Sequence, residues 1–228
     1  MAPLEIPTND PRPGLAYPMS ETRLHRLIVQ VARWFLGLFM ILQVSGLENL
    51  PTAGAAVVAA NHLVAFDVFP VQLALPRMVF FMGKAELFQI GFVHSIFRQM
   101  GGFPVYRGEH DTWAFEHAQK LLAASQIVAM FPEGTRSRGK GLTLARPGAA
   151  RLAIEMGCPL VAISVDGIQH LFKKFPLRTV VQVVIAAPII ASRNESPLSL
   201  TDALMFTMAK NLPQGLRGAY AQMPKGFE

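Results

Sequence analysis

From residue 55 onward, short apolar runs alternate with longer segments that mix apolar and polar residues. The runs predict strands at 55–60, 78–82, 127–131, 160–165 and 180–187. The segments between them predict helices at about 67–75, 85–99, 111–125 and 147–157. Because the predicted strands are apolar without alternation and are separated by helices, we expect an α/β fold. Its central sheet should be mostly parallel, with helices flanking both faces.

An earlier apolar stretch, residues 24–44, has a different pattern. A helix that crosses a bilayer needs about 20 mostly apolar residues, and the uninterrupted run here is shorter. Arg23, Arg26 and Arg33 flank or interrupt the apolar face. We therefore interpret residues 21–46 as a membrane-associated helical segment that lies in the interface or dips into one leaflet. The alternative is a helix that is buried against the domain.

These patterns divide the chain into three parts. Residues 1–20 contain five prolines and lack the apolar core of a signal peptide, which predicts a flexible tail. The membrane-associated segment follows, and residues 47–228 form the α/β domain. A chain of 228 residues is long enough for one such domain with an appendage.

Composition narrows the choice of partners. The chain is 51% hydrophobic and 16% charged, whereas about 25% of residues are charged in an ordinary globular domain. Its net charge of +6 favours an anionic membrane surface or a phosphate-bearing ligand. No nucleic-acid partner is expected, because the chain has no Lys/Arg tract and no recognisable nucleic-acid module. Cys158 is the single cysteine, which excludes an intrachain disulfide.

Two polar clusters directly follow predicted strands, where parallel sheets place their ligands. The first contains Asn61 and His62, and Asp67 comes five residues after the histidine. His62 and Asp67 could meet if the histidine sits in a turn and the aspartate begins the next helix. A carboxylate on one imidazole nitrogen would leave the other nitrogen free to accept a proton. The chain has no G-x-S-x-G nucleophile motif, so the pair suits direct activation of a substrate hydroxyl. The alternative is a structural histidine.

The second cluster is FPEGTRSRGKG, at 131–141. Its arginines could bind phosphate through their planar fork, although the segment could also be a solvated basic loop. A weaker signal is GGFPVYRG, at 101–108, which contains Arg107. The histidine spacings indicate no metal site.

Together these blocks resemble the glycerolipid acyltransferase family, in particular its 1-acylglycerol-3-phosphate acyltransferases, over about residues 44–190. The family's N-H-x4-D motif is matched by Asn61, His62 and Asp67, and its F-P-E-G-T-R-S motif by residues 131–137. A Gly-rich motif that ends in Arg is matched by Gly101, Gly102 and Arg107. A fourth motif is matched in part, since Ala162 stands where the family usually has a second proline.

The resemblance implies a reaction. His62 would be the general base on the free hydroxyl of a lysophospholipid, and Asp67 would orient it. The hydroxyl would attack the thioester of acyl-CoA or acyl-carrier protein directly, without an acyl-enzyme and without a further cofactor or metal. The implied substrate-binding residues are Arg107, Glu133, Gly134, Thr135 and Arg136, with the two arginines on the acceptor phosphate.

The implied product is phosphatidic acid, made from 1-acylglycerol-3-phosphate. The implied enzyme is membrane-associated, in contact with membrane lipids, and its active site faces the cytoplasm. Other acceptors remain alternatives, namely glycerol-3-phosphate, another lysophospholipid or a lyso-aminolipid. A non-catalytic membrane lipid-binding protein is a further alternative, although binding alone needs no base.

Overall fold

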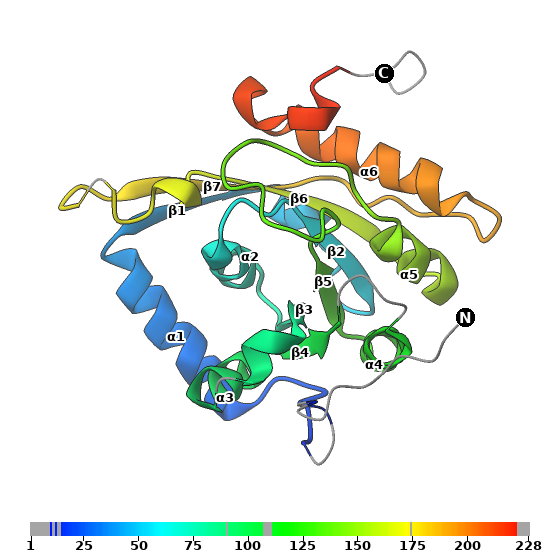
Figure 1. Ribbon diagram of the computed structural model, residues 1–228, viewed down its shortest axis with the longest axis horizontal. Helices are drawn as coiled ribbons and strands as arrows, with labels where there is room; N and C mark the ends of the chain where they lie inside the picture. Colours follow the sequence, from blue (N-terminus) through cyan, green and yellow to red (C-terminus); the bar gives the residue numbers. More distant parts are fainter. Residues whose placement is uncertain are drawn as a thin grey trace.

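A computed structural model describes residues 10, 12, 15–89, 91–106, 111–173 and 175–222. Its centre is a seven-stranded sheet in the order β1-β7-β6-β2-β5-β3-β4 (Figure 1). The strands are β1 (Met40–Ser45), β2 (Ala56–Ala60), β3 (Val79–Lys84), β4 (Gly102–Val105), β5 (Ile127–Met130), β6 (Leu160–Asp166) and β7 (Thr179–Ile185). Only the β6–β7 pairing is antiparallel within this sheet. The predicted α/β fold with a mostly parallel sheet is confirmed.

Helices cover both faces of the sheet (Figure 1). They are α1 (Arg23–Gly37), α2 (Val68–Ala74), α3 (Gly91–Gln99), α4 (Thr112–Ala123), α5 (Gly148–Met156) and α6 (Pro197–Lys210). On one face, α4, α5 and α6 pack against the sheet, and on the other face lie α1 and α2. The helix α3 packs beside β4 and a short 3-10 turn, η3 (Ala85–Gln89).

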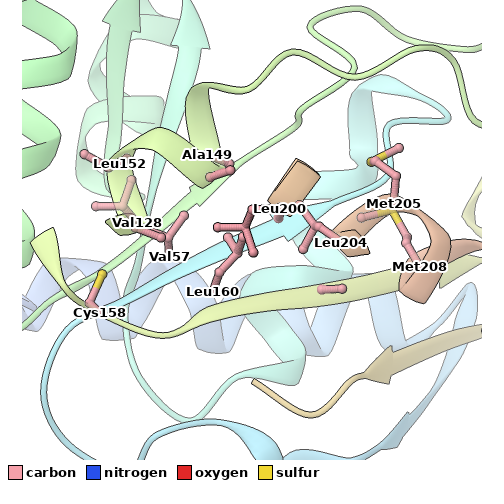
Figure 2. Packing of buried hydrophobic residues seen from close by; sticks show 14 of the residues in the cluster. Val57, Val128, Ala149, Leu152, Cys158, Leu160, Leu200, Leu204, Met205 and Met208 are labelled. Carbon is pink, nitrogen blue, oxygen red and sulfur yellow. The ribbon is translucent and has the colours of Figure 1, made fainter. Parts of the chain in front are cut away.

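Two apolar cores, one on each face, explain why the strands lack alternation. Val57 of β2 points to the α5 and α6 side, whereas Val58 points to the α2 side, and both are fully buried. Figure 2 shows Val57 among Leu160 of β6, Leu152 of α5 and Leu204 of α6. A strand that is buried on both faces reads as a continuous apolar run.

The segment at 21–46 differs from the prediction, because only its first part is helical. The helix α1 ends at Gly37, and residues 40–45 form the edge strand β1 instead of further helix. Each residue of β1 pairs with a residue of β7, so backbone hydrogen bonds to a distant part of the chain determine this conformation. No helix within the described residues is long and apolar enough to cross a membrane.

Part of residues 1–20, for which the sequence predicted a flexible tail, makes contacts with the domain in the structure. The guanidinium of Arg12 lies 2.8 Å from both Asp10 and Asp111. Tyr17 packs edge-on against Trp113, with 5.5 Å between ring centroids. These contacts tie this part of the tail to α4.

Candidate active site

His62 and Asp67 lie between β2 and α2, at the carboxyl end of a central strand. His62 follows β2 in a turn, and Asp67 ends a 3-10 turn, η2 (Ala65–Asp67), that leads directly into α2. This is the arrangement that the sequence required for the two side chains to meet. Nδ1 of His62 lies 2.8 Å from Oδ2 of Asp67, and the same oxygen accepts a hydrogen bond from the Val64 N–H at 2.8 Å.

The surroundings of the pair hold it in one orientation. Asp67 is fully buried, and its other oxygen, Oδ1, has no hydrogen-bond partner among the described residues. Burial raises the pKa of the Asp67 carboxyl, while the hydrogen bonds from His62 and Val64 act in the opposite direction. The His62 ring stacks on Phe131 at 4.2 Å between centroids. The imidazole is therefore held by a carboxylate at Nδ1 and by an aromatic face, which leaves Nε2 as the free ring nitrogen.

Glu133 connects the loop after β5 to the turn that carries His62. Its Oε1 accepts a hydrogen bond from the His62 N–H at 2.8 Å. Its Oε2 accepts from the N–H and hydroxyl of Thr143, at 2.9 and 3.0 Å. Glu133 is buried, and burial raises the pKa of its carboxyl. Both carboxylate oxygens thus bind groups of the protein, which indicates a positioning role and not direct contact with a substrate phosphate.

Backbone hydrogen bonds continue this connection between the two loops. The Ser137 N–H donates to the His62 carbonyl at 2.8 Å, and the Arg138 N–H donates to the Leu63 carbonyl at 3.1 Å. Asn61 anchors the other side of the turn, because its side chain exchanges two hydrogen bonds with the backbone of Val165, at 2.7 and 2.9 Å. Hydrogen bonds therefore connect the N-H-x4-D motif to the F-P-E-G-T-R-S motif and to β6.

Two cavities meet at these connected motifs. One is an apolar cavity of about 230 Å³, lined by His62, Phe69 and Phe131 and by side chains of β3, η3 and α3. The other is a wider cleft of about 710 Å³, whose titratable lining consists of three basic side chains, Arg136, Arg138 and Lys173, together with His170 and the carboxyl group of Asp166. Arg136 and Ala65 line both cavities, so Arg136 lies where they join.

The remaining residues that the sequence predicted for substrate binding differ in their positions. Arg136 and Thr135 are exposed, and Arg136 lines the cavities as described. Gly134 adopts a left-handed backbone conformation, with φ of 68°, that glycine takes up without strain. Arg107 lies outside the described residues. Ala162 is buried in the middle of β6 and is not among the residues that line the two cavities.

Sequence reasoning missed two side chains that line the wider cleft. His170 and Lys173 follow β6 in the loop that leads to β7, about 100 residues from His62 in the chain. No motif marks them, and only the folded sheet brings this loop next to the turn that carries His62. Arg138 was part of the basic cluster that the sequence indicated, but its position in the cleft depends on the backbone bond to Leu63.

Comparison with known proteins places this arrangement in a family. A family profile described as acyltransferase matches residues 41–166, which contain the His62–Asp67 pair and the loop after β5. The chain belongs to the acyltransferase family.

Two relatives carry the name 1-acyl-sn-glycerol-3-phosphate acyltransferase. The protein from Bacillus subtilis (strain 168) is 33% identical over 138 residues, which cover 59% of this chain and 68% of the relative. The protein from Borreliella burgdorferi is 26% identical over 153 residues, which cover 65% of this chain and 60% of the relative. The matched region of this acyltransferase family member thus spans 60% of the Borreliella burgdorferi protein and 68% of the Bacillus subtilis protein.

A solved structure shows the same fold. It is the crystal structure of the 1-acyl-sn-glycerophosphate (LPA) acyltransferase PlsC from Thermotoga maritima, which superposes with a TM-score of 0.66. The match covers 82% of this chain and 78% of that chain, at 24% sequence identity. The sheet and its flanking helices are therefore those of a known acyltransferase.

Proposed function

We propose that this protein is an O-acyltransferase that transfers a fatty acyl group from a thioester to the free hydroxyl of 1-acylglycerol-3-phosphate, giving phosphatidic acid. The observation that carries the proposal is the His62–Asp67 pair, which borders an apolar cavity that Arg136 joins to a basic cleft. The names of the two relatives support the same acceptor. The donor would be acyl-CoA or acyl-carrier protein.

The geometry supports a direct transfer. Nδ1–H of His62 donates to Asp67, so the lone pair on Nε2 can take the proton of the acceptor hydroxyl. The hydroxyl oxygen then forms a bond to the thioester carbonyl carbon. When the resulting tetrahedral species collapses, the carbon–sulfur bond breaks and the proton on Nε2 passes to the departing thiolate. The products are an ester and a free thiol, and His62 returns to its neutral form.

The two cavities suit an apolar acyl chain and a charged phosphate group, respectively. The apolar cavity has the lining that an acyl chain requires, and it borders the imidazole. The basic cleft offers charge-assisted hydrogen bonds to phosphate through Arg136 and Arg138. Arg136, at the junction, would hold the acceptor phosphate and so fix the distance from its hydroxyl to His62. Arg107 remains a predicted second ligand of that phosphate.

We also propose that the enzyme is membrane-associated through α1, with the active site facing the cytoplasm, where a water-soluble thioester donor would reach it. His25 and Leu36 are buried on the domain side of α1, whereas Leu27, Val31 and Trp34 are exposed. The exposed residues are three and four positions apart, which places them on one face of the helix. An apolar helix face parallel to a bilayer surface is typical of interfacial attachment.

The test is a panel of acceptors offered to the purified protein in detergent. Release of free thiol from acyl-CoA or acyl-carrier protein is measured with 1-acylglycerol-3-phosphate, glycerol-3-phosphate, another lysophospholipid and a lyso-aminolipid, and products are read by mass spectrometry. We expect the highest kcat/KM with 1-acylglycerol-3-phosphate. A preference for another acceptor would revise the substrate, and binding without thiol release from any pair would contradict the enzymatic proposal.

A further inference from the structure

The loop between β6 and β7 exposes large apolar side chains that the proposed mechanism does not use. Phe175 is 69% exposed and Leu177 is 73% exposed. Phe172 has a φ of 68°, a left-handed conformation that bulky residues rarely adopt, and its ring is also exposed. Exposed apolar side chains that gather on one loop mark an interaction surface. We call Phe172, Phe175 and Leu177 the apolar tip.

A chain of aromatic contacts joins the apolar tip to the catalytic cavity. Phe39, just before β1, contacts both Phe172 and Phe175, with ring centroids 4.9 and 5.8 Å apart. Phe172 lies 6.1 Å from Phe66, which is also exposed and belongs to the turn that carries the catalytic pair. Phe66 stacks on Phe69, and Phe69 lines the apolar cavity. An apolar path therefore runs from the tip to the site where an acyl chain would bind.

Basic residues flank the apolar tip. Lys173 and Arg178 are exposed within the same loop, and Arg178 donates a hydrogen bond to the carbonyl of Met40 at 3.1 Å. Because α1 leads into β1 at this end of the sheet, the loop and the end of α1 lie close together (Figure 1). Apolar side chains with a basic rim complement a bilayer that exposes anionic headgroups.

We propose that the β6–β7 loop is a second membrane-contact element, which inserts Phe175 and Leu177 into the interface of an anionic bilayer beside α1. Lys173 and Arg178 bind the headgroups, and Phe172 holds the loop against the catalytic turn. The mouth of the apolar cavity is thereby held at the lipid surface. This interaction does not depend on acyl transfer, so it can be tested in a protein without activity.

The first experiment compares matched double variants of the full chain. Phe175→Ser/Leu177→Ser alters the tip, and Ile190→Ser/Leu198→Ser alters two comparably exposed positions, 72% and 64%, which follow β7 in the chain. Binding to vesicles of phosphatidylcholine and phosphatidylglycerol is measured by flotation. We expect the tip variant to lose about tenfold or more in partitioning, because two apolar side chains no longer leave water, while the control variant keeps native binding. Equal binding by both variants would overturn the proposal.

A second measurement remains informative even if α1 alone suffices to hold the protein on vesicles. Cys158 is buried and is the single cysteine, so Phe175→Cys and Ile190→Cys can each be labelled with an environment-sensitive fluorophore. We expect the label at 175 to shift to the blue on adding the same vesicles, and the label at 190 to stay unchanged. No shift at 175 on bound protein would contradict insertion.

A change from dimer to monomer in the tip variant without lipid, seen by light scattering, would assign the tip to a second copy of the chain instead.

Discussion

At the scale of residues, the sequence indicated the His62–Asp67 pair because its two members are close along the chain. Only one turn had to form for His62 and Asp67 to meet, and the boundary between β2 and η2 provides it. The position of Glu133 was harder to predict, because two of its three hydrogen-bond donors are backbone N–H groups, one of them 71 residues away. A carboxylate in a basic loop suggests a phosphate site, but burial and three protein donors make it a link between two loops.

Removing the proposed base tests the role of the pair. We expect His62→Ala to lower kcat by about 10²–10⁴-fold or more, because no other group would take the hydroxyl proton. Asp67→Asn should lower kcat with a smaller effect on both KM values, since Asp67 orients the imidazole and does not touch substrate. Rates of thiol release give both constants, and circular dichroism checks that each variant is folded. Near-native turnover by a folded His62→Ala protein would contradict the mechanism.

The proposed phosphate ligand gives a different kinetic signature. Arg136 is exposed at the junction of the two cavities, so its replacement should leave the fold intact. We expect Arg136→Ala to raise the KM for 1-acylglycerol-3-phosphate by about 10–100-fold, the cost of losing hydrogen bonds to a charged group. Arg136→Lys should recover little, because lysine lacks the planar fork. Arg193→Ala, at another exposed arginine, is the control, and a rise in the donor KM alone would assign Arg136 to the donor phosphates.

At the scale of elements, the pattern of apolar runs predicted the strands and helices that are buried on both sides. It did not predict β1, β4 or α6. The segment that forms β1 continues the apolar pattern of the helix before it. It is a strand and not further helix because it pairs with β7. The helix α6 is buried along most of its length against β6 and α5, so it lacks the polar face that identifies an amphipathic helix.

The exposed face of α1 makes a prediction about the proposed interfacial attachment. Arg33, which the sequence placed at the margin of an apolar membrane face, instead donates a hydrogen bond to the Leu73 carbonyl at 2.8 Å and so fastens α1 to the domain. Deleting the segment would therefore damage the fold as well as the attachment, and substitutions on the exposed face are the cleaner test. We expect Leu27→Ser/Trp34→Ser to reduce binding to anionic vesicles several-fold, because both side chains are exposed in the protein. Flotation measures the binding, an unchanged unfolding temperature confirms that the domain is intact, and native binding by this variant would contradict attachment through α1.

At the scale of the whole molecule, the buried carboxyl groups of the site make the stability of the fold depend on pH. Asp67 and Glu133 are both buried, and burial raises the pKa of each carboxyl. Ionising a buried carboxyl costs free energy that an exposed one does not incur, and the hydrogen bonds from backbone N–H groups offset only part of that cost. The free energy of unfolding should therefore fall as the pH rises through the range in which these buried carboxyl groups ionise.

This balance predicts how the free energy of unfolding varies with pH. Because the pKa of Glu133 is raised above its ordinary 4.5 in the folded protein, the unfolded chain releases this proton first as the pH rises. Between the two pKa values the unfolded state binds fewer protons, so the native protein loses stability relative to Glu133→Gln, which does not titrate there. The loss is at most about 1.4 kcal/mol per pH unit and stops above the raised pKa.

Urea denaturation at a series of pH values from 4.5 upward measures the difference between the two proteins. Glu133→Gln also loses hydrogen bonds, but that cost shifts the whole curve and leaves its slope unchanged. Glu116→Gln, at an exposed position on α4, controls for the loss of one charge. A difference that grows in favour of the native protein as the pH rises would mean that the N–H donors outweigh burial at Glu133.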